Sequence, residues 1–87
     1  MNIYLSSGYI KAYRKILRKK PYLNDKVKKA LKTLSENPRY PSLRLHKLEG
    51  GPYKNWSISI EKDIRLLFSY VEDGIILVDI GSHNEIY

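Results

Sequence analysis

Residues 56–80 read WSISIEKDIRLLFSYVEDGIILVDI, and this stretch decides the fold class. Apolar and polar side chains alternate over residues 56–60, as in a strand with one buried face. Residues 64–71 and 75–80 are rich in β-branched and aromatic side chains, and residues 72–74 between them form a hairpin signal, Glu-Asp-Gly. These three segments predict an antiparallel sheet.

The register of the hairpin decides which side chains share a face of this sheet, because a slip of one residue turns a strand over. A two-residue turn at Asp73-Gly74 would place Phe68 opposite Asp79, whereas a three-residue loop would place Leu67 there. We favour the longer loop, which gathers one apolar set of side chains for the helices and one polar set on the other face. The apolar set is Leu66, Phe68 and Tyr70, and the polar set is Ser57, Ser59, Arg65 and Asp79.

The N-terminal half predicts two basic amphipathic helices joined by a tight turn. Ser6-Ser7 can cap the first helix, whose apolar residues recur at helical spacing and which should end near Lys20, before Pro21. Asn24 is a candidate cap for the second helix, and Asn37-Pro38 should end it, because a residue before proline is disfavoured in helical geometry. The two helices form a hairpin whose apolar side must be buried against another element.

The whole chain is therefore expected to form one α+β domain over residues 1–87. A short apolar strand at residues 3–5 precedes the two-helix hairpin, which packs on a twisted antiparallel sheet. Eighty-seven residues with 43% apolar content are enough for a single core. They leave no room for a second domain.

The charge of the chain is divided unevenly between its two halves. Residues 1–48 hold 13 basic and 2 acidic residues, net +11, whereas residues 49–87 hold 3 basic and 7 acidic residues, net −4. A solvated, lysine-rich helical face explains any single lysine. The asymmetry as a whole favours a polyanion such as RNA, or an acidic protein, as the partner.

Other function classes are disfavoured by what the sequence lacks. No stretch approaches the roughly 20 apolar residues of a membrane helix, and the first residues do not resemble a signal peptide, so we expect a cytoplasmic protein without a membrane partner. The chain has no cysteine, and His46 and His83 are far apart in sequence, so we expect neither a metal nor another cofactor. Phosphate-cradling glycine loops, serine triads and carboxylate dyads are also missing.

Three residues could carry chemistry on a phosphodiester. Arg65 interrupts an otherwise apolar strand, where its charge must meet a carboxylate, a phosphate or water. It either forms an ion pair with Asp63 or Asp79 or clamps a phosphate, for which the planar guanidinium is well suited. His83 follows the last strand and can give and take a proton near neutral pH, although a lone histidine is most often a surface residue. Tyr87 offers a ring for stacking on a base, or an anchor for the tail.

Further basic residues lie close to the predicted sheet. His46 and Lys47 belong to the leucine-rich segment ahead of Trp56, and Lys54 directly precedes that strand. If the sheet folds as predicted, these three side chains border the same face as Arg65.

Taken together, these segments resemble the RelE/ParE toxin superfamily, and in particular its YafQ-like (RelE/StbE) branch. The likeness covers essentially the whole chain. It rests on the order of strand, two basic helices and sheet, and on four stretches: LHKLEG at 45–50, WSISI at 56–60, DIRLLF at 63–68 and, most specifically, GSHNEIY at 81–87.

The resemblance implies a toxin of a type II toxin–antitoxin pair that cuts mRNA in the ribosomal A site without a metal. By position, Arg65 matches the family's phosphate-stabilising arginine, His83 the catalytic histidine and general acid, and Tyr87 the terminal aromatic that holds a base. His46 matches a histidine that assists as a base or in RNA contact. Further RNA contacts are expected from Arg44, Lys47, Lys54 and Asp63, the last at an acidic position of the family. The expected partner is an acidic, partly disordered antitoxin.

Two departures from the family pattern concern the same face of the sheet. Ser57 and Ser59 stand where relatives carry an acid or a histidine, and Asp79 stands where they carry an arginine four residues before the terminal histidine. Losing a cation and gaining an anion predicts weaker phosphate binding. Two alternatives to the ribonuclease therefore remain, namely a ParE-like inhibitor of DNA gyrase and a homologue that binds nucleic acid or its antitoxin but cleaves weakly or not at all.

Overall fold

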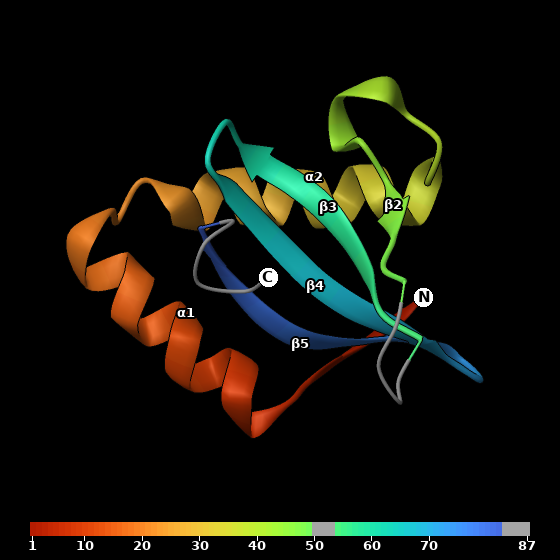
Figure 1. Ribbon diagram of the computed structural model, residues 1–87, viewed down its shortest axis with the longest axis horizontal. Helices are drawn as coiled ribbons and strands as arrows, with labels where there is room; N and C mark the ends of the chain where they lie inside the picture. Colours follow the sequence, from red (N-terminus) through yellow and green to blue (C-terminus); the bar gives the residue numbers. More distant parts are fainter. Residues whose placement is uncertain (50–53, 83–87) are drawn as a thin grey trace.

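The computed structural model describes residues 1–49 and 54–82, and it shows two helices packed on a five-stranded sheet (Figure 1). The helices are α1 (Ser7–Lys19) and α2 (Leu23–Glu36), and a single 3-10 turn, η1 (Pro41–Leu43), follows them. The strands are β1 (Asn2–Leu5), β2 (His46–Lys47), β3 (Trp56–Glu61), β4 (Ile64–Val71) and β5 (Gly74–Ser82). The prediction of an α+β fold is confirmed.

The sheet has the order β1-β5-β4-β3-β2, and it is mixed rather than antiparallel. The three strands predicted from residues 56–80 pair in antiparallel fashion, as does β2 with β3. β1 instead runs parallel to β5, with Asn2 opposite Gly74 and Leu5 opposite Leu77. β1 and β5 lie at opposite ends of the described chain and are not joined by a hairpin, which would have required antiparallel pairing.

The predicted three-residue loop of the β4–β5 hairpin is wrong, although the predicted pairing of Leu67 with Asp79 is present. Val71 pairs with Gly74, so the turn contains only Glu72 and Asp73. The register then shifts between Leu67 and Phe68. Phe68 pairs with Leu77 and Leu67 pairs with Asp79, so β5 has one extra residue between these two pairs. A β-bulge on β5 thus produces the pairing of Leu67 with Asp79 that the longer loop was expected to produce.

Both helices begin and end close to the predicted residues. Ser6 caps α1 by accepting a hydrogen bond from the backbone N–H of Tyr9 at 3.0 Å, and Asn37 follows the last turn of α2. Asn24 is not a cap, because α2 already begins at Leu23 and the Asn24 side chain accepts a hydrogen bond from the Tyr13 hydroxyl at 2.7 Å. Neither described helix has the length and apolar character required to cross a membrane.

The two helices pack on the sheet rather than along each other. α1 lies against β5, whereas α2 passes behind the sheet in Figure 1 and packs against β3. Their apolar faces and one face of the sheet enclose a single buried cluster that includes Tyr9, Leu23, Leu34, Leu66 and Phe68. We call this side of the sheet the helix face and the opposite side the outer face.

Tyr70 does not join this core as predicted. Its side chain is 48% exposed, and its ring meets the rings of Trp56 and Phe68 edge-on at the end of the helix face. Tyr70 lies one residue before the end of β4, where its ring is left open to solvent.

β1 approaches the tip of the hairpin very closely. A Cβ atom on Gly74 would lie 1.9 Å from the carbonyl oxygen of Asn2, so no residue with a side chain fits without moving β1. The Asp73 carboxylate accepts hydrogen bonds from the side chains of Asn2 and Tyr4 at 2.9 and 2.7 Å, and these bonds lower the pKa of Asp73. The short N-terminal strand is thereby attached to the turn.

Candidate functional site

The outer face carries the polar residues that the sequence placed there. Directly opposite residues of an antiparallel pair share a face. One row across the sheet therefore runs through His46, Ser57, Leu67 and Asp79, and the next row through Ser59, Arg65 and Gly81. The prediction that Ser57, Ser59, Arg65 and Asp79 lie together on this face is confirmed by the pairing.

Arg65 stands at the centre of these rows, half-buried, and is held by two uncharged oxygen atoms. Its Nε donates to the Ser57 hydroxyl at 2.9 Å, and its Nη2 donates to the backbone carbonyl of Arg44 at 2.9 Å. Neither Asp63 nor Asp79 forms an ion pair with it, since the ion pairs within residues 1–49 and 54–82 both involve Glu61. The guanidinium is therefore oriented without being neutralised there.

Ser57 is fully buried beneath this guanidinium, at 0% exposure. A buried hydroxyl must find hydrogen-bonding partners, and the Arg65 Nε supplies one. Ser59 has a different role, because its hydroxyl donates to the backbone carbonyl of Glu61 at 3.3 Å, in the irregular end of β3. Of the two serines that depart from the family pattern, Ser57 thus orients the arginine and Ser59 supports the strand.

Arg44 presents its carbonyl to Arg65 through an unusual backbone conformation. With φ 48° and ψ 50° it is left-handed, and it is the one non-glycine residue with a positive φ in the described part of the chain. L-residues avoid this region because Cβ crowds the backbone. The conformation ends η1 and sends the chain into β2.

His46 lies on the same face as Arg65. It is exposed and sits directly opposite Ser57, the residue that accepts the Arg65 hydrogen bond. The structure thus brings together His46, Ser57 and Arg65, from three neighbouring strands. An imidazole and an oriented cation on one face of a sheet are groups that can take part in chemistry on a phosphodiester.

The other predicted RNA contacts are dispersed. Lys47 pairs with Trp56 and belongs to the opposite side of the sheet from His46, with its Nζ 5.9 Å from the centre of the Trp56 ring. Lys54 precedes β3 and Asp63 lies in the turn after it, so these two exposed residues mark opposite ends of that strand. The expectation that Lys47 and Lys54 border the face of Arg65 is therefore wrong for Lys47, because successive side chains of a strand point to opposite faces.

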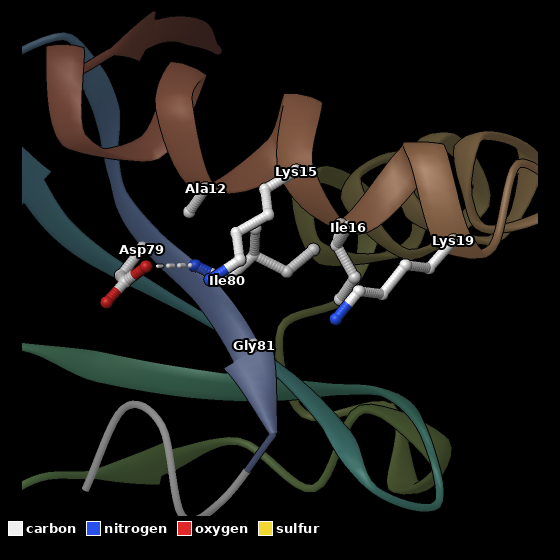
Figure 2. Close-up of a pocket in the computed structure, with 7 residues that line it drawn as sticks. All are labelled: Ala12, Lys15, Ile16, Lys19, Asp79, Ile80 and Gly81. Atoms are coloured by element: carbon white, nitrogen blue, oxygen red, sulfur yellow. Dashed lines mark hydrogen bonds between the residues drawn. The ribbon is translucent and has the colours of Figure 1, made fainter.

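Asp79 is half-buried at the free edge of β5, beside α1 (Figure 2). Its Oδ1 accepts a hydrogen bond from the backbone N–H of Ile80 at 2.8 Å. Lys15 and Lys19 extend from α1 along the same small cavity of about 180 Å³. Neither lysine forms an ion pair with the carboxylate in the described ranges, although both line the same cavity close to the row of Arg65.

His83 and Tyr87 lie outside the described residues. Ser82, the residue before His83 in the sequence, pairs with Ile64, the neighbour of Arg65. In the parts of the chain that the structure describes, His, Cys, Asp and Glu side chains form no group of three that could hold a metal ion.

Sequence reasoning missed the part of the site that the Arg44 backbone supplies. Arg44 was expected to contact RNA, and the structure gives its carbonyl oxygen a further role, which is to hold Arg65. No sequence signal marks this role, because a left-handed conformation at an arginine goes against its local preference.

Residues 1–87 match the model of a protein family described as "Bacterial toxin of type II toxin-antitoxin system, YafQ". No curated protein matches the chain by sequence.

Solved structures share the fold at low sequence identity. A copper-bound mutant toxin from Helicobacter pylori superimposes with a TM-score of 0.88 at 24% identity, covering 100% of this chain and 99% of that one. YafQ from E. coli gives a TM-score of 0.82 at 18% identity over 99% and 97% of the two chains. The E. coli DinJ–YafQ toxin–antitoxin complex gives 0.76 at 24% identity over 99% and 96%.

Proposed function

Since this chain belongs to the YafQ family of bacterial toxins from type II toxin–antitoxin systems, we propose that it is an endoribonuclease that cleaves mRNA on the ribosome. The observation that carries the proposal is the state of Arg65. A half-buried guanidinium held by a hydroxyl and a carbonyl, with no carboxylate beside it in the described part of the chain, keeps a full positive charge for a phosphate.

The proposed reaction is an internal transfer on RNA. The ribose 2′-hydroxyl attacks the adjacent phosphorus while a base takes its proton, and an acid protonates the leaving 5′-oxygen as the P–O bond breaks. The products are a 2′,3′-cyclic phosphate and a free 5′-hydroxyl. Arg65 stabilises the charge that develops on the phosphoryl oxygens, where a fixed cation is most effective.

The remaining roles are assigned from the family pattern. His83 is the general acid, and His46 is the base or an RNA contact, which its exposed position opposite Ser57 supports. Tyr87 holds the base beside the cleaved linkage. Arg44, Lys47, Lys54 and Asp63 provide further contacts to the RNA.

We further propose an acidic antitoxin as the protein partner and the ribosomal A site as the place of action. The E. coli relative is crystallised as a complex of YafQ with DinJ. In this chain the net charge of +7, and of +11 over residues 1–48, calls for a partner of opposite charge. A cytoplasmic location is part of the same proposal.

The proposal is tested with the variants Arg65→Ala and His83→Ala. Each should lower cleavage of ribosome-bound mRNA by about 100-fold or more and relieve growth inhibition, because each removes a group acting in the transition state. Cleavage is measured by mapping cut sites in a translated message. Circular dichroism checks that the fold is intact.

Lys62→Ala is the matched control, since it removes an exposed cation from the β3–β4 turn and should leave cleavage unchanged. A double variant of Arg65 and His83 that still cuts mRNA would refute the assigned roles. Inhibition of DNA supercoiling by the purified protein, with ribosome-bound mRNA left whole, would instead indicate the gyrase-inhibiting alternative.

A further inference from the structure

A groove with aromatic and basic walls lies at the end of the helix face, on the other side of β2 from Arg65. It has a volume of about 630 Å³ and runs between the segment around η1 and the ends of β3 and β4. Three rings line it, those of Tyr40, Trp56 and Tyr70. The groove belongs neither to the buried core nor to the outer face described above.

Two rings of this groove are open to solvent, and one of them, that of Tyr70, is held by neighbouring rings. Tyr40 and Tyr70 are 50% and 48% exposed. Tyr70 meets Trp56 edge-on with ring centres 5.8 Å apart, and Phe68 edge-on at 5.3 Å. Such edge contacts fix the orientation of a ring while leaving a face free for another flat group.

Positive charges surround the groove. Arg39 and Arg44 line it, and the Lys47 ammonium lies 5.9 Å from the Trp56 ring. Within residues 1–49 and 54–82, no acidic residue lines the groove. Rings together with two guanidinium groups suit a ligand that alternates flat bases with phosphates, as single-stranded nucleic acid does.

Arg44 connects the groove to the candidate active site. Arg44 lines the groove, and its backbone carbonyl accepts the hydrogen bond from Arg65. Arg44 is therefore shared by the groove and the Arg65 site.

We propose that this groove binds an unpaired base of the RNA strand next to the cleaved linkage, by stacking on Tyr40 and Tyr70. The proposal rests on the proposed ribonuclease function, and adds to it a second contact that positions the substrate. Arg39 and Arg44 bind the flanking phosphates. Lys47, which the sheet turns away from the face of Arg65, contacts RNA here instead.

Trp56 makes the groove directly measurable, because it is the one tryptophan of the sequence and lines the groove. The probe is a short single-stranded RNA with 2′-O-methyl riboses, which carries no nucleophile and stays whole. Binding should quench the Trp56 emission. Tyr40→Ala and Tyr70→Ala should each weaken the affinity for this RNA by about tenfold, as expected for the loss of one base–ring stack.

Tyr22→Ala is the matched control, an equally exposed tyrosine (51%) at the start of α2, and should bind RNA as the unchanged protein does. A second measurement does not depend on variants. RNA carrying 4-thiouridine should crosslink on irradiation to Tyr40, Trp56 or Tyr70 in the unchanged protein.

The proposal is overturned if Tyr40→Ala and Tyr70→Ala bind the RNA as tightly as Tyr22→Ala and the crosslinks fall elsewhere. It is also overturned if RNA leaves the Trp56 emission unchanged while purified antitoxin quenches it, since the groove would then hold the protein partner. Because the probe cannot be cleaved, binding is judged separately from catalysis. If the unchanged protein binds the probe by stacking but cleaves no mRNA, the result counts against the proposed ribonuclease function and not against the groove.

Discussion

At the scale of single residues, the site is built by backbone and hydroxyl groups as much as by charged side chains. Arg65 is oriented by the Ser57 hydroxyl and the Arg44 carbonyl. Uncharged acceptors fix the guanidinium without lowering its affinity for a phosphate, whereas a carboxylate would compete with it. Ser57, a departure from the family pattern, therefore fits a site that holds its arginine in place.

Asp79 is the residue that should limit activity. Replacing it with arginine, Asp79→Arg, removes an anion and adds a cation close to the row of Arg65, and should tighten RNA binding and raise cleavage by roughly tenfold. The measurements are the affinity for uncleavable RNA and the rate of mRNA cleavage.

Asp79→Asn serves as the control for this prediction. The amide keeps an oxygen acceptor for the Ile80 N–H and removes only the negative charge, so its effect should fall between those of the aspartate and the arginine. Equal cleavage by all three proteins would show that the side chain at position 79 does not face the RNA.

At the scale of elements, Glu61 ties the junction of the two helices to the end of β3. Its carboxylate accepts hydrogen bonds from the Tyr22 hydroxyl at 2.9 Å and from the Lys26 ammonium at 3.1 Å, and Lys20 lies 3.6 Å away. Partial burial would raise the pKa of Glu61. The hydrogen bonds from Lys26 and Tyr22 and the charges of Lys26 and Lys20 outweigh that effect and lower the pKa.

Glu61→Gln should therefore lower the free energy of unfolding by about 1 kcal/mol near neutral pH, a modest value because both lysines are about half exposed. Because the pKa of Glu61 is lowered in the folded state, its carboxylate stabilises the folded protein at pH values above the ordinary glutamate pKa of 4.5. This stabilisation is lost as the pH falls through the folded-state pKa. Denaturant unfolding at neutral pH and at about pH 3 should show the difference between the two proteins disappearing in acid.

Glu72→Gln, which changes an exposed carboxylate in the β4–β5 turn, is the control and should show no such difference at neutral pH. A Glu61→Gln variant as stable as the unchanged protein at neutral pH would mean that the junction is held by apolar packing alone.

At the scale of the whole molecule, the uneven charge of the sequence becomes a spatial separation. The helices α1 and α2 carry nine of the sixteen basic residues, whereas Asp63, Glu72 and Asp73 lie in the turns of the β3–β4–β5 meander. The exposed side of α1 forms an open basic surface that includes Lys11, Arg14 and Arg18. Such a surface attracts a polyanion or an acidic protein over a distance set by the salt concentration.

The complex with an acidic antitoxin should therefore weaken as salt rises from about 0.1 M to about 1 M, over which the screening length falls from roughly 10 Å to roughly 3 Å. Titration calorimetry across this range measures the effect. Neutralising Lys11, Arg14 and Arg18 together should weaken the complex at low salt and flatten its salt dependence. Affinity that does not change with salt would show that apolar contacts dominate the interface.

The sequence by itself determined which segments become helices and strands, because hydrophobic periodicity and end signals act locally. The strands at 64–71 and 75–80, the cap at Ser6 and the helix end at Asn37 all appear where these signals place them. The resemblance in the same residues indicated the family, which the match over residues 1–87 confirms.

Only the tertiary structure decided how these segments meet. The parallel pairing of β1, the bulge in the β4–β5 hairpin and the left-handed turn at Arg44 all depend on contacts between residues distant in sequence. No local propensity specifies these three features, because each one is stabilised by packing with other parts of the fold. For the same reason, the sequence predicted that Arg65 lies on the outer face but left open whether it forms an ion pair with a carboxylate. Within the described residues the fold gives Arg65 a hydroxyl and a carbonyl as partners and no carboxylate.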